Sequence, residues 1–222
     1  MDSPSDAPGH VIALCDAGTA VDLALVLAVD CSSSVDVGDY RIQMDGIAAA
    51  LRNPLLRDTI RNGGTGRIAL TLVQWAGRKS QAVALPWRLL GSGVDLEMAA
   101  REIEAAERHG QPGGTGLAAA IDFSTALQET LTIAASRRVI DVSGDGEDNE
   151  DGDTLGARSR AIGRGITING LPILSGSRQL VGYYQDQVIG GTGAFLEPAA
   201  NIMSFRDTIL RKLLREIGRP VS

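Results

Sequence analysis

Five oxygen-bearing side chains stand where apolar or glycine-rich stretches of this chain end, and their types suit the binding of a hard metal ion. They are Asp30, Ser32, Ser34, Thr115 and Asp145. Carboxylate and hydroxyl oxygens are the ligands that Mg²⁺, Ca²⁺ and Mn²⁺ prefer, whereas zinc and copper favour histidines and thiols, which do not cluster here. The sequence therefore predicts a site for a divalent cation, Mg²⁺ first, with Ca²⁺ and Mn²⁺ as alternatives.

The spacing within two of these stretches supports that prediction. In DCSSS (30–34) the acid and two serines alternate, and a tight turn would aim every second side chain in the same direction. In GGTG (113–116) glycines surround the threonine, and residues without a Cβ atom let a loop approach its neighbours closely. Taken by itself, DCSSS also fits a turn from a strand into a helix whose first amides are capped by serines.

Strand and helix patterns alternate along the rest of the chain. Apolar runs of strand length predict strands at 21–29, 67–77, 81–90, 137–146, 165–174 and 193–199. Apolar residues at helical spacing predict helices at 40–51, from Asp95 to near Gly110, and at 117–131, 154–163 and 204–217. Residues 179–191 fit either a short helix or an irregular loop.

Individual residues mark where these elements are expected to start and stop. Pro54 is expected to stop the first helix, and Asp95 to cap the second. Ser204 with Asp207 resembles a capping box at the start of the last helix. Pro86 suits an edge strand, because proline cannot donate a hydrogen bond to a neighbouring strand.

This alternation predicts an α/β fold of the doubly wound type, with a mostly parallel central sheet and helices on both faces. Segments 67–77 and 81–90 are expected to form an antiparallel pair at one edge. We expect a single domain at 21–219 after a flexible segment at 1–20. In such sheets ligands bind at the carboxyl ends of the strands where strand order reverses, which is where the candidate ligands stand.

Composition and charge bound the classes of partner. The net charge is −6 and no basic stripe is visible, so neither nucleic acid nor an anionic membrane is an expected partner. No apolar run reaches the roughly 18 residues that a membrane-spanning helix needs. The spacing of Cys15 and Cys31 suggests neither a metal site nor a redox pair; the two could form a disulfide, or Cys31 could be a small buried residue.

The ordered set of motifs resembles the metal-ion-dependent adhesion site (MIDAS) of von Willebrand factor A domains. There an Asp-x-Ser-x-Ser motif is followed by a distant threonine and a distant aspartate. Here DCSSS (30–34), GGTG (113–116) and SGDG (143–146) stand in the same order. Each motif by itself is common, but all three in order, each at a predicted strand end or helix start, form a specific signal.

The resemblance also implies a role for each of the five residues. Ser32 and Ser34 are expected to bind the ion directly, and Thr115 either directly or through water. Asp30 and Asp145 are expected to act mostly through water. The polar residue that is typical before the last aspartate is a glycine here, at position 144, which puts the reach of the aspartate in question.

Longer stretches, between about Val21 and Gly218, resemble a bacterial family of the same superfamily that is classed as a domain of unknown function. They are VDLALVLAVD, GRIALTLVQWAG, LPWRLL, RRVIDVSGDGEDN, GITINGLPIL and VIGGTGAF. A signal peptide usually precedes that family, which implies a periplasmic or exported protein. The start of this chain lacks the basic and apolar regions of such a signal, which fits a cytoplasmic protein or one whose signal has been removed.

The function implied by the resemblance is not enzymatic. It is a metal-dependent adhesion or scaffold module, in which the cation recruits an Asp or Glu carboxylate from an unidentified protein partner. The alternative is a Mg²⁺-dependent hydrolase or phosphotransferase that uses Asp30, although such enzymes want a second acid two residues on, where this chain has Ser32. Neither glycine-rich nucleotide-binding motif follows the first strand, so a nucleotide-binding protein is set aside.

Two further groups of acids need an explanation. DGEDNEDGD (145–153) partly matches an EF-hand calcium loop, but its twelfth position would be Arg158 instead of glutamate, so a solvated acidic loop is favoured. Asp141 lies inside an apolar strand, where a carboxylate needs a partner. Arg137, Arg138 or a backbone amide are the expected candidates.

Overall fold

The computed structural model describes residues 20–109, 113–175 and 178–218. The strands are β1 (Ala20–Val21), β2 (Leu23–Asp30), β3 (Ile68–Trp75), β4 (Gln81–Leu90), β5 (Ala134–Ala135), β6 (Arg138–Gly144) and β7 (Ile166–Pro172). The helices are α1 (Val37–Leu51), α2 (Pro54–Arg61), α3 (Gly93–Ala105), α4 (Leu117–Thr130), α5 (Thr154–Gly163), α6 (Gln179–Tyr183) and α7 (Phe205–Ile217), with a π turn η1 (Tyr184–Val188) and a 3₁₀ turn η2 (Ile202–Ser204). Residues 1–19 of the segment predicted to be flexible lie outside the described residues.

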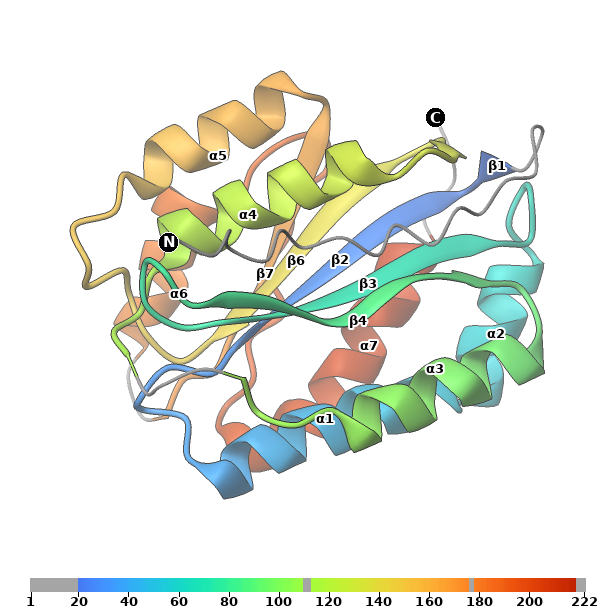
Figure 1. The fold of residues 1–222 in the computed structure, drawn as a ribbon, viewed down its shortest axis with the longest axis horizontal. Helices are drawn as coiled ribbons and strands as arrows, with labels where there is room; N and C mark the ends of the chain where they lie inside the picture. Colours follow the sequence, from blue (N-terminus) through green and yellow to red (C-terminus); the bar gives the residue numbers. More distant parts are fainter. Residues whose placement is uncertain (1–19, 110–112, 176–177, 219–222) are drawn as a thin grey trace, which may run out of the picture.

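Five strands form the central sheet, in the order β4-β3-β2-β6-β7 (Figure 1). β2 pairs in parallel with β3 and β6, β6 pairs in parallel with β7, and β4 runs antiparallel to β3 at one edge. The pairing of β3 with β4 is irregular opposite Pro86, which has no N–H to donate. The predicted fold class, doubly wound with one antiparallel edge strand, is confirmed.

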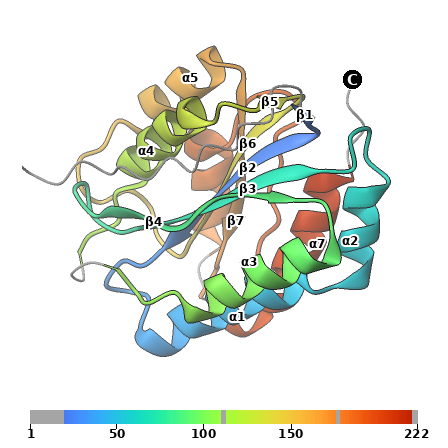
Figure 2. The same cartoon turned by 45° about the vertical axis from the view of Figure 1, so that its right-hand side comes forward.

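Helices cover both faces of the sheet (Figures 1 and 2). On one face, Leu25 and Leu27 of β2 pack in a core that includes residues of α1, α2, α3 and α7. On the other face, Val26 and Ala28 pack with residues of α4 and α5. Because every residue of β2 and β3 is buried, these strands are continuous apolar runs instead of alternating ones. Among the described residues, no helix combines the length and apolar character needed to cross a membrane.

The carboxyl ends of β2 and β6 are neighbours at the point where the connections of the chain diverge. From β2 the chain passes through α1 and α2 to β3 on one side, and from β6 it passes through α5 to β7 on the other. The last paired residues of the two strands are Val29 and Ser143. Since ligands of doubly wound sheets bind at such a divergence, this is the edge at which a site is expected.

The expected helix ends are confirmed in one case and wrong in another. α1 ends at Leu51, before Pro54 as expected, but Pro54 also begins α2, which was not predicted; its missing N–H costs nothing there, and Asn53 supplies the cap. α3 ends at Ala105 instead of near Gly110. Asp95 does not cap α3. Ser92 is the N-cap, and the Asp95 carboxylate accepts a hydrogen bond from the Ser92 backbone N–H (2.8 Å), which completes a capping box.

The segment after α6 and η1 also differs from its prediction. Residues 193–199 do not form a strand; single bridges join Gly170 to Leu196 and Ile173 to Ala199 beside β7. Pro198 cannot donate a hydrogen bond, which prevents a continuous ladder here. The Ser204 side chain does not cap α7; it closes a capping box with Asn201 around η2 instead.

The expected partner of Asp141 is also wrong. Asp141 is 3% exposed, and its Oδ1 lies 2.7 Å from Nζ of Lys212 on α7. Arg137 donates instead to the carbonyl of Glu216 (2.9 Å), and Arg138 to the carbonyl of Gln128 (3.5 Å). The two arginines stand at the start of β6, whereas Asp141 lies in its middle, under the helix that covers this face.

The capping box of α3 can be tested by removing the Ser92 hydroxyl. Ser92→Ala leaves an amide of the first helical turn without its cap, and we expect the free energy of unfolding to fall by about 1 kcal/mol in a urea titration. Ser159→Ala is the matched control. Ser159 lies in the middle of α5, its side chain is exposed, and its hydroxyl donates to the carbonyl of Leu155 in the same helix. Equal effects of the two substitutions would contradict the assignment of the cap.

Candidate metal centre

The turn after β2 is shaped by the carboxylate of Asp30. Asp30 is fully buried, and its Oδ1 accepts a hydrogen bond from the backbone N–H of Ser32 (2.7 Å). The N–H of Cys31 donates to the carbonyl of Trp75 (2.7 Å), so the contact with β3 continues one residue beyond β2. Ser32 is buried and Ser34 is exposed, so the turn leads from the interior to the surface.

Three of the predicted ligands meet at this surface. The Ser32 and Ser34 hydroxyl oxygens lie 3.1 Å apart, and the Ser34 hydroxyl donates to Oδ1 of Asp145 (2.7 Å). Neighbouring oxygens around an octahedral Mg²⁺ ion lie about 2.9 Å apart, since each is about 2.1 Å from the ion. The observed oxygen–oxygen distances therefore match those of adjacent ligands of one small cation. The glycine at 144 does not keep Asp145 out of reach.

The GGTG segment approaches the turn through its backbone. The carbonyl of Gly113 accepts a hydrogen bond from the N–H of Ser33 (3.0 Å), and the N–H of Gly116 donates to the carbonyl of Ala76 (2.9 Å). A Cβ atom on Gly116 would lie 2.9 Å from the backbone of Gly77. The expected close approach is therefore present at Gly116, where no larger residue fits.

Thr115 lies beside the residue that follows Asp145. Its hydroxyl oxygen is 3.3 Å from the place that a Cβ atom on Gly146 would occupy. Its backbone N–H donates to Oδ1 of Asn149 (2.7 Å), and the N–H of Asn149 donates back to the carbonyl of Thr115 (3.0 Å). The threonine loop and the loop after β6 are thus joined side by side at the edge where the serine turn ends.

The buried side of the site is rich in polar atoms that lack partners. Within the described residues, Oδ2 of Asp30, the hydroxyl of Tyr184 and Nε1 of Trp75 make no hydrogen bond. A Cβ atom on Gly144 would lie 2.9 Å from both Asp30 Oδ2 and the Tyr184 hydroxyl. The glycine thus provides room for this tyrosine, which explains the departure from the usual polar residue at position 144.

Burial governs the charge of Asp30. Desolvation raises the pKa of Asp30 to about 7, the Ser32 hydrogen bonds lower it, and the Asp145 charge raises it further. A buried carboxylate with an unpartnered oxygen is the kind of group that a cation stabilises. Within the described parts of the chain, no group of three or more His, Cys, Asp or Glu side chains is arranged to hold a metal ion, so a cation here would need the serine and threonine hydroxyls as ligands.

Cys31 takes no part in such a site. Its thiol is free and buried, and desolvation together with the Asp30 charge raises its pKa to about 12. A neutral thiol is a poor ligand, so the cysteine acts as a small core residue. Cys15 lies outside the described residues, so the predicted choice between a disulfide and a buried thiol is settled for Cys31 only.

Two residues that position the serine turn were missed in the sequence. Arg108 donates to the carbonyls of Cys31 (2.8 Å) and Ser32 (3.0 Å). Buried Gln74 holds the loop that carries this arginine, since it donates to the carbonyl of Glu107 (2.9 Å) and accepts from the N–H of His109 (2.6 Å). The sequence did contain a signal for Gln74, because a glutamine inside the apolar run 67–77 needs polar partners once it is buried.

The acidic loop after β6 is structural, not simply solvated. The Asp148 carboxylate accepts hydrogen bonds from the backbone N–H groups of Ala118 (3.0 Å), Glu150 (3.1 Å) and Gly152 (3.0 Å). The Glu150 carboxylate accepts from the N–H groups of Arg78 (2.5 Å) and Gly114 (3.2 Å). Asn149, at the third position of the partial EF-hand match, also accepts from a backbone amide, the N–H of Thr115 (2.7 Å), so the loop is held by contacts with the backbone.

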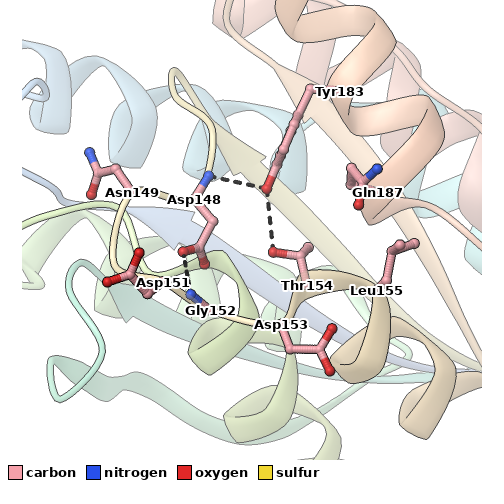
Figure 3. A pocket seen from close by; sticks show the side chains of 9 residues that line it. All are labelled: Asp148, Asn149, Asp151, Gly152, Asp153, Thr154, Leu155, Tyr183 and Gln187. Atoms are coloured by element: carbon pink, nitrogen blue, oxygen red, sulfur yellow. Dashed lines mark hydrogen bonds between the residues drawn. The ribbon is translucent and has the colours of Figure 1, made fainter.

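A pocket of about 340 Å³ opens on the other side of this loop (Figure 3). The Tyr183 hydroxyl accepts from the N–H of Asp148 (3.2 Å) and lies 3.3 Å from the Thr154 hydroxyl, and Gln187 also faces the cavity. None of the five predicted ligands lines this pocket. The cavity and the candidate metal centre are therefore separate features of the same edge.

Comparison with protein families decides which family this is. The model of the family described as "Protein of unknown function (DUF1194)" matches residues 20–221. The chain belongs to this family. No curated protein sequence matches the DUF1194 chain.

Solved structures of similar fold include von Willebrand factor domains, a pilus adhesin and a mussel byssus protein. The pilus adhesin SpaC of Lactobacillus rhamnosus GG is 14% identical, with a TM-score of 0.64 over 90% of this chain and 31% of that one. Proximal thread matrix protein 1 of the mussel byssus, with a zinc-occupied MIDAS motif, is 13% identical, with a TM-score of 0.59 over 91% and 48%. The von Willebrand factor domain of the type V pilus tip protein Mfa5 of Porphyromonas gingivalis is 11% identical, with a TM-score of 0.58 over 90% and 98%.

These likenesses show the fold, which is von Willebrand A-like. The chain spans 31% of the adhesin and 48% of the mussel protein, so it corresponds to one part of each.

Ion binding at this site should depend on pH. The pKa of Asp30 is about 7 in the folded protein, and its ordinary value is 3.8. At a pH between these two values, Asp30 of the folded metal-free protein therefore holds a proton that the unfolded chain has lost. The metal-free protein therefore loses stability as pH rises between these values. A bound cation would compensate the charge of the ionised Asp30 carboxylate. The difference between the Tm measured with Mg²⁺ and the Tm measured with EDTA should therefore be larger at pH about 8 than at pH about 6.

Asp30→Asn is the control for that measurement. The amide is similar in shape but has no charge to lose, so the gain from Mg²⁺ should be small and should not change with pH. A gain from Mg²⁺ that is equal at both pH values in the unsubstituted protein would contradict the role of Asp30.

Proposed function

We propose that this DUF1194 chain is a non-enzymatic binding module in which a divalent cation recruits a carboxylate from a protein partner. Its ligands are the residues expected from the sequence: Asp30, Ser32, Ser34, Thr115 and Asp145. The observation that supports this most directly is the contact of the Ser34 hydroxyl with both Ser32 (3.1 Å) and Asp145 (2.7 Å). Oxygen atoms from separate loops thus approach one another at distances suited to one ion.

The ligand types favour an incoming anion. Ser32 and Ser34 offer neutral hydroxyls, and Asp30 is tied to the Ser32 N–H and is fully buried. A cation held mainly by neutral oxygens keeps most of its charge and an exchangeable water position. An Asp or Glu side chain of another protein can fill that position, and the contact is strengthened by the partly dry surroundings.

Helix ends add little to this preference. α1 begins shortly after the serine turn, and α4 begins at Leu117, directly after the threonine loop. The Asp36 carboxylate already accepts from the N–H of Asp39 at the start of α1 (2.8 Å), and the Asp148 carboxylate accepts from the N–H of Ala118 in α4 (3.0 Å). These acids offset the partial positive charge that the two N-termini would otherwise offer to an incoming anion.

An enzymatic role for Asp30 has less support. A nucleophilic carboxylate has to reach its substrate, and Asp30 is 0% exposed. The position two residues on is Ser32, where a phosphotransferase of this type would need a second acid. Mg²⁺ is the first candidate for the ion, and Ca²⁺ or Mn²⁺ are the alternatives, because all three accept hydroxyl and carboxylate oxygens.

The structural relatives support a location and a class of partner. The similar proteins include a pilus adhesin and a pilus tip protein. A module of the same fold that binds carboxylates through a metal ion would act outside the cytoplasm, in the periplasm or after export. Its partner would be another protein with an exposed Asp or Glu.

Affinity capture with the purified chain tests the proposal. Proteins of the source organism are passed over the immobilised chain with Mg²⁺ and released with EDTA. We expect Ser34→Ala to reduce the Mg²⁺-dependent recovery at least tenfold, because it removes the hydroxyl shared by Ser32 and Asp145. The captured protein should in turn lose binding when one exposed Asp or Glu is replaced by Asn or Gln.

Ser33→Ala is the matched control. Ser33 lies in the same turn and its side chain is exposed. Its hydrogen bond to the carbonyl of Gly113 is made by the backbone N–H, which alanine keeps. Capture should therefore be unchanged. Capture that survives both EDTA and Ser34→Ala would refute the metal-bridged mechanism.

A further inference from the structure

A second cluster of charged residues is sealed between the sheet and α7, away from the candidate metal centre. It consists of Asp141 on β6, Asn169 on β7, and Lys212 and Glu216 on α7. Their exposed fractions are 3%, 0%, 0% and 1%. Four polar side chains in a dry interior need a strong physical reason, because burying a charge costs several kcal/mol even when it is paired.

The contact between Lys212 and Asp141 is close and has little support from other groups. Nζ lies 2.7 Å from Oδ1, the distance of an ammonium that donates to a carboxylate, and no other group among the described residues donates to Asp141. A buried ion pair is usually stabilised by several further hydrogen bonds. Here the amine lies in direct contact with a carboxyl group that has no other partner in the described structure.

The other two residues hold an acid beside the amine. Glu216 Oε2 lies 3.7 Å from Nζ of Lys212. The Asn169 side-chain amide donates to both Glu216 oxygens (2.9 and 2.7 Å), and its Oδ1 accepts from the N–H of Phe195 (2.8 Å). Glu216 is therefore fixed as a hydrogen-bond acceptor, and Asn169 is fully engaged, which leaves Asp141 as the carboxyl group open to the amine.

Burial and the neighbouring charges act on the pair in opposite directions. Burial raises the pKa of Asp141 to about 6, although the Lys212 charge and its hydrogen bond lower it. Nζ also lies 4.8 Å from the centre of the Phe195 ring, a contact that favours the charged ammonium. Formation of an amine and a carboxylic acid needs the transfer of one proton from the ammonium to the carboxylate, which removes two charges from a region where charges are costly.

We propose that Lys212 and Asp141 become joined by an isopeptide bond that links α7 covalently to β6. The amine lone pair attacks Cγ of the protonated Asp141, and a C–N bond forms. Glu216 takes a proton from the nitrogen and passes it to the hydroxyl group on Cγ. The C–O bond then breaks, one water leaves, and Glu216 is again a carboxylate. The reaction needs no oxidant, reductant or other co-reactant.

The close contact of the amine and the carboxyl group lowers the barrier to the reaction between them. Two groups held at contact distance react as if at a very high effective concentration, and a dry pocket removes the solvent that would otherwise stabilise their charges. The same exclusion of water protects the amide from hydrolysis once it has formed. The product would restrict the unfolded chain as a disulfide does, but thiols could not reduce it.

Intact mass spectrometry of the purified chain in denaturant tests the bond, because a non-covalent ion pair does not survive denaturation. The expected mass is one water molecule below that of the linear chain. Trypsin should then release a branched peptide that joins residues 139–158 to residues 212–215, since a modified Lys212 is not cleaved. The full linear mass, or a water loss at any other pair, would overturn the proposal.

Substitution of Glu216 tests the proton carrier. Glu216→Gln keeps the shape of the side chain but cannot accept the proton, so the cross-linked fraction should fall at least tenfold in freshly purified protein. Glu197→Gln is the matched control, because Glu197 pairs with Arg211 and Arg215 of α7 instead of Lys212. A folded Glu216→Gln protein that is fully cross-linked would refute the role given to Glu216, and the mass of the unsubstituted chain decides the bond independently.

Discussion

The parallel pairing of β2 with β6 is the constraint on which the candidate metal centre depends. Ser34 and Asp145 are 111 residues apart in the sequence, yet their side chains meet at 2.7 Å. They meet because the register sets Val29 beside Ser143, so the two turns leave the sheet at the same level. A slip of one residue would move every side chain of a strand to the opposite face. Since both strands are almost wholly buried, apolar packing fixes the register, and the geometry of the polar edge follows from it.

Three buried carboxylates show how differently one fold can satisfy the same requirement. Asp22 accepts hydrogen bonds from the N–H groups of Thr65 (2.8 Å) and Gly66 (3.1 Å), so the backbone compensates its charge. Asp141 has the Lys212 amine beside it. Asp30 has one oxygen on the Ser32 N–H and the other without a partner in the described structure. Asp30 is thus the buried acid for which an added cation would bring the largest gain, and it lies beneath the hydroxyls that could bind one.

The sequence was sufficient for features that depend on long, uniform patterns. The apolar runs gave the strands of the sheet, and the position of the DCSSS, GGTG and SGDG motifs at strand ends gave the edge at which they converge. Features that depend on a single contact between distant residues could not be predicted from the sequence. Nothing in the run RRVIDVS indicates that a lysine 71 residues later will lie beside Asp141, because α7 could have packed in several registers. Local capping at Ser92 was misjudged because two residues compete for the same helix end, and only the backbone geometry selects one.

The two polar clusters are connected mechanically through α7. This helix contacts β6, the strand that leads to Asp145, through Lys212 and Asp141. It also packs closely on α1, the helix that follows the serine turn: a Cβ atom on Gly46 would lie 3.1 Å from the Phe205 ring. The elements behind both halves of the metal centre therefore rest on one helix. The proposed covalent link between α7 and β6 would hold this helix against the strand, so movement caused by an ion bound between the two turns would be confined to the turns themselves.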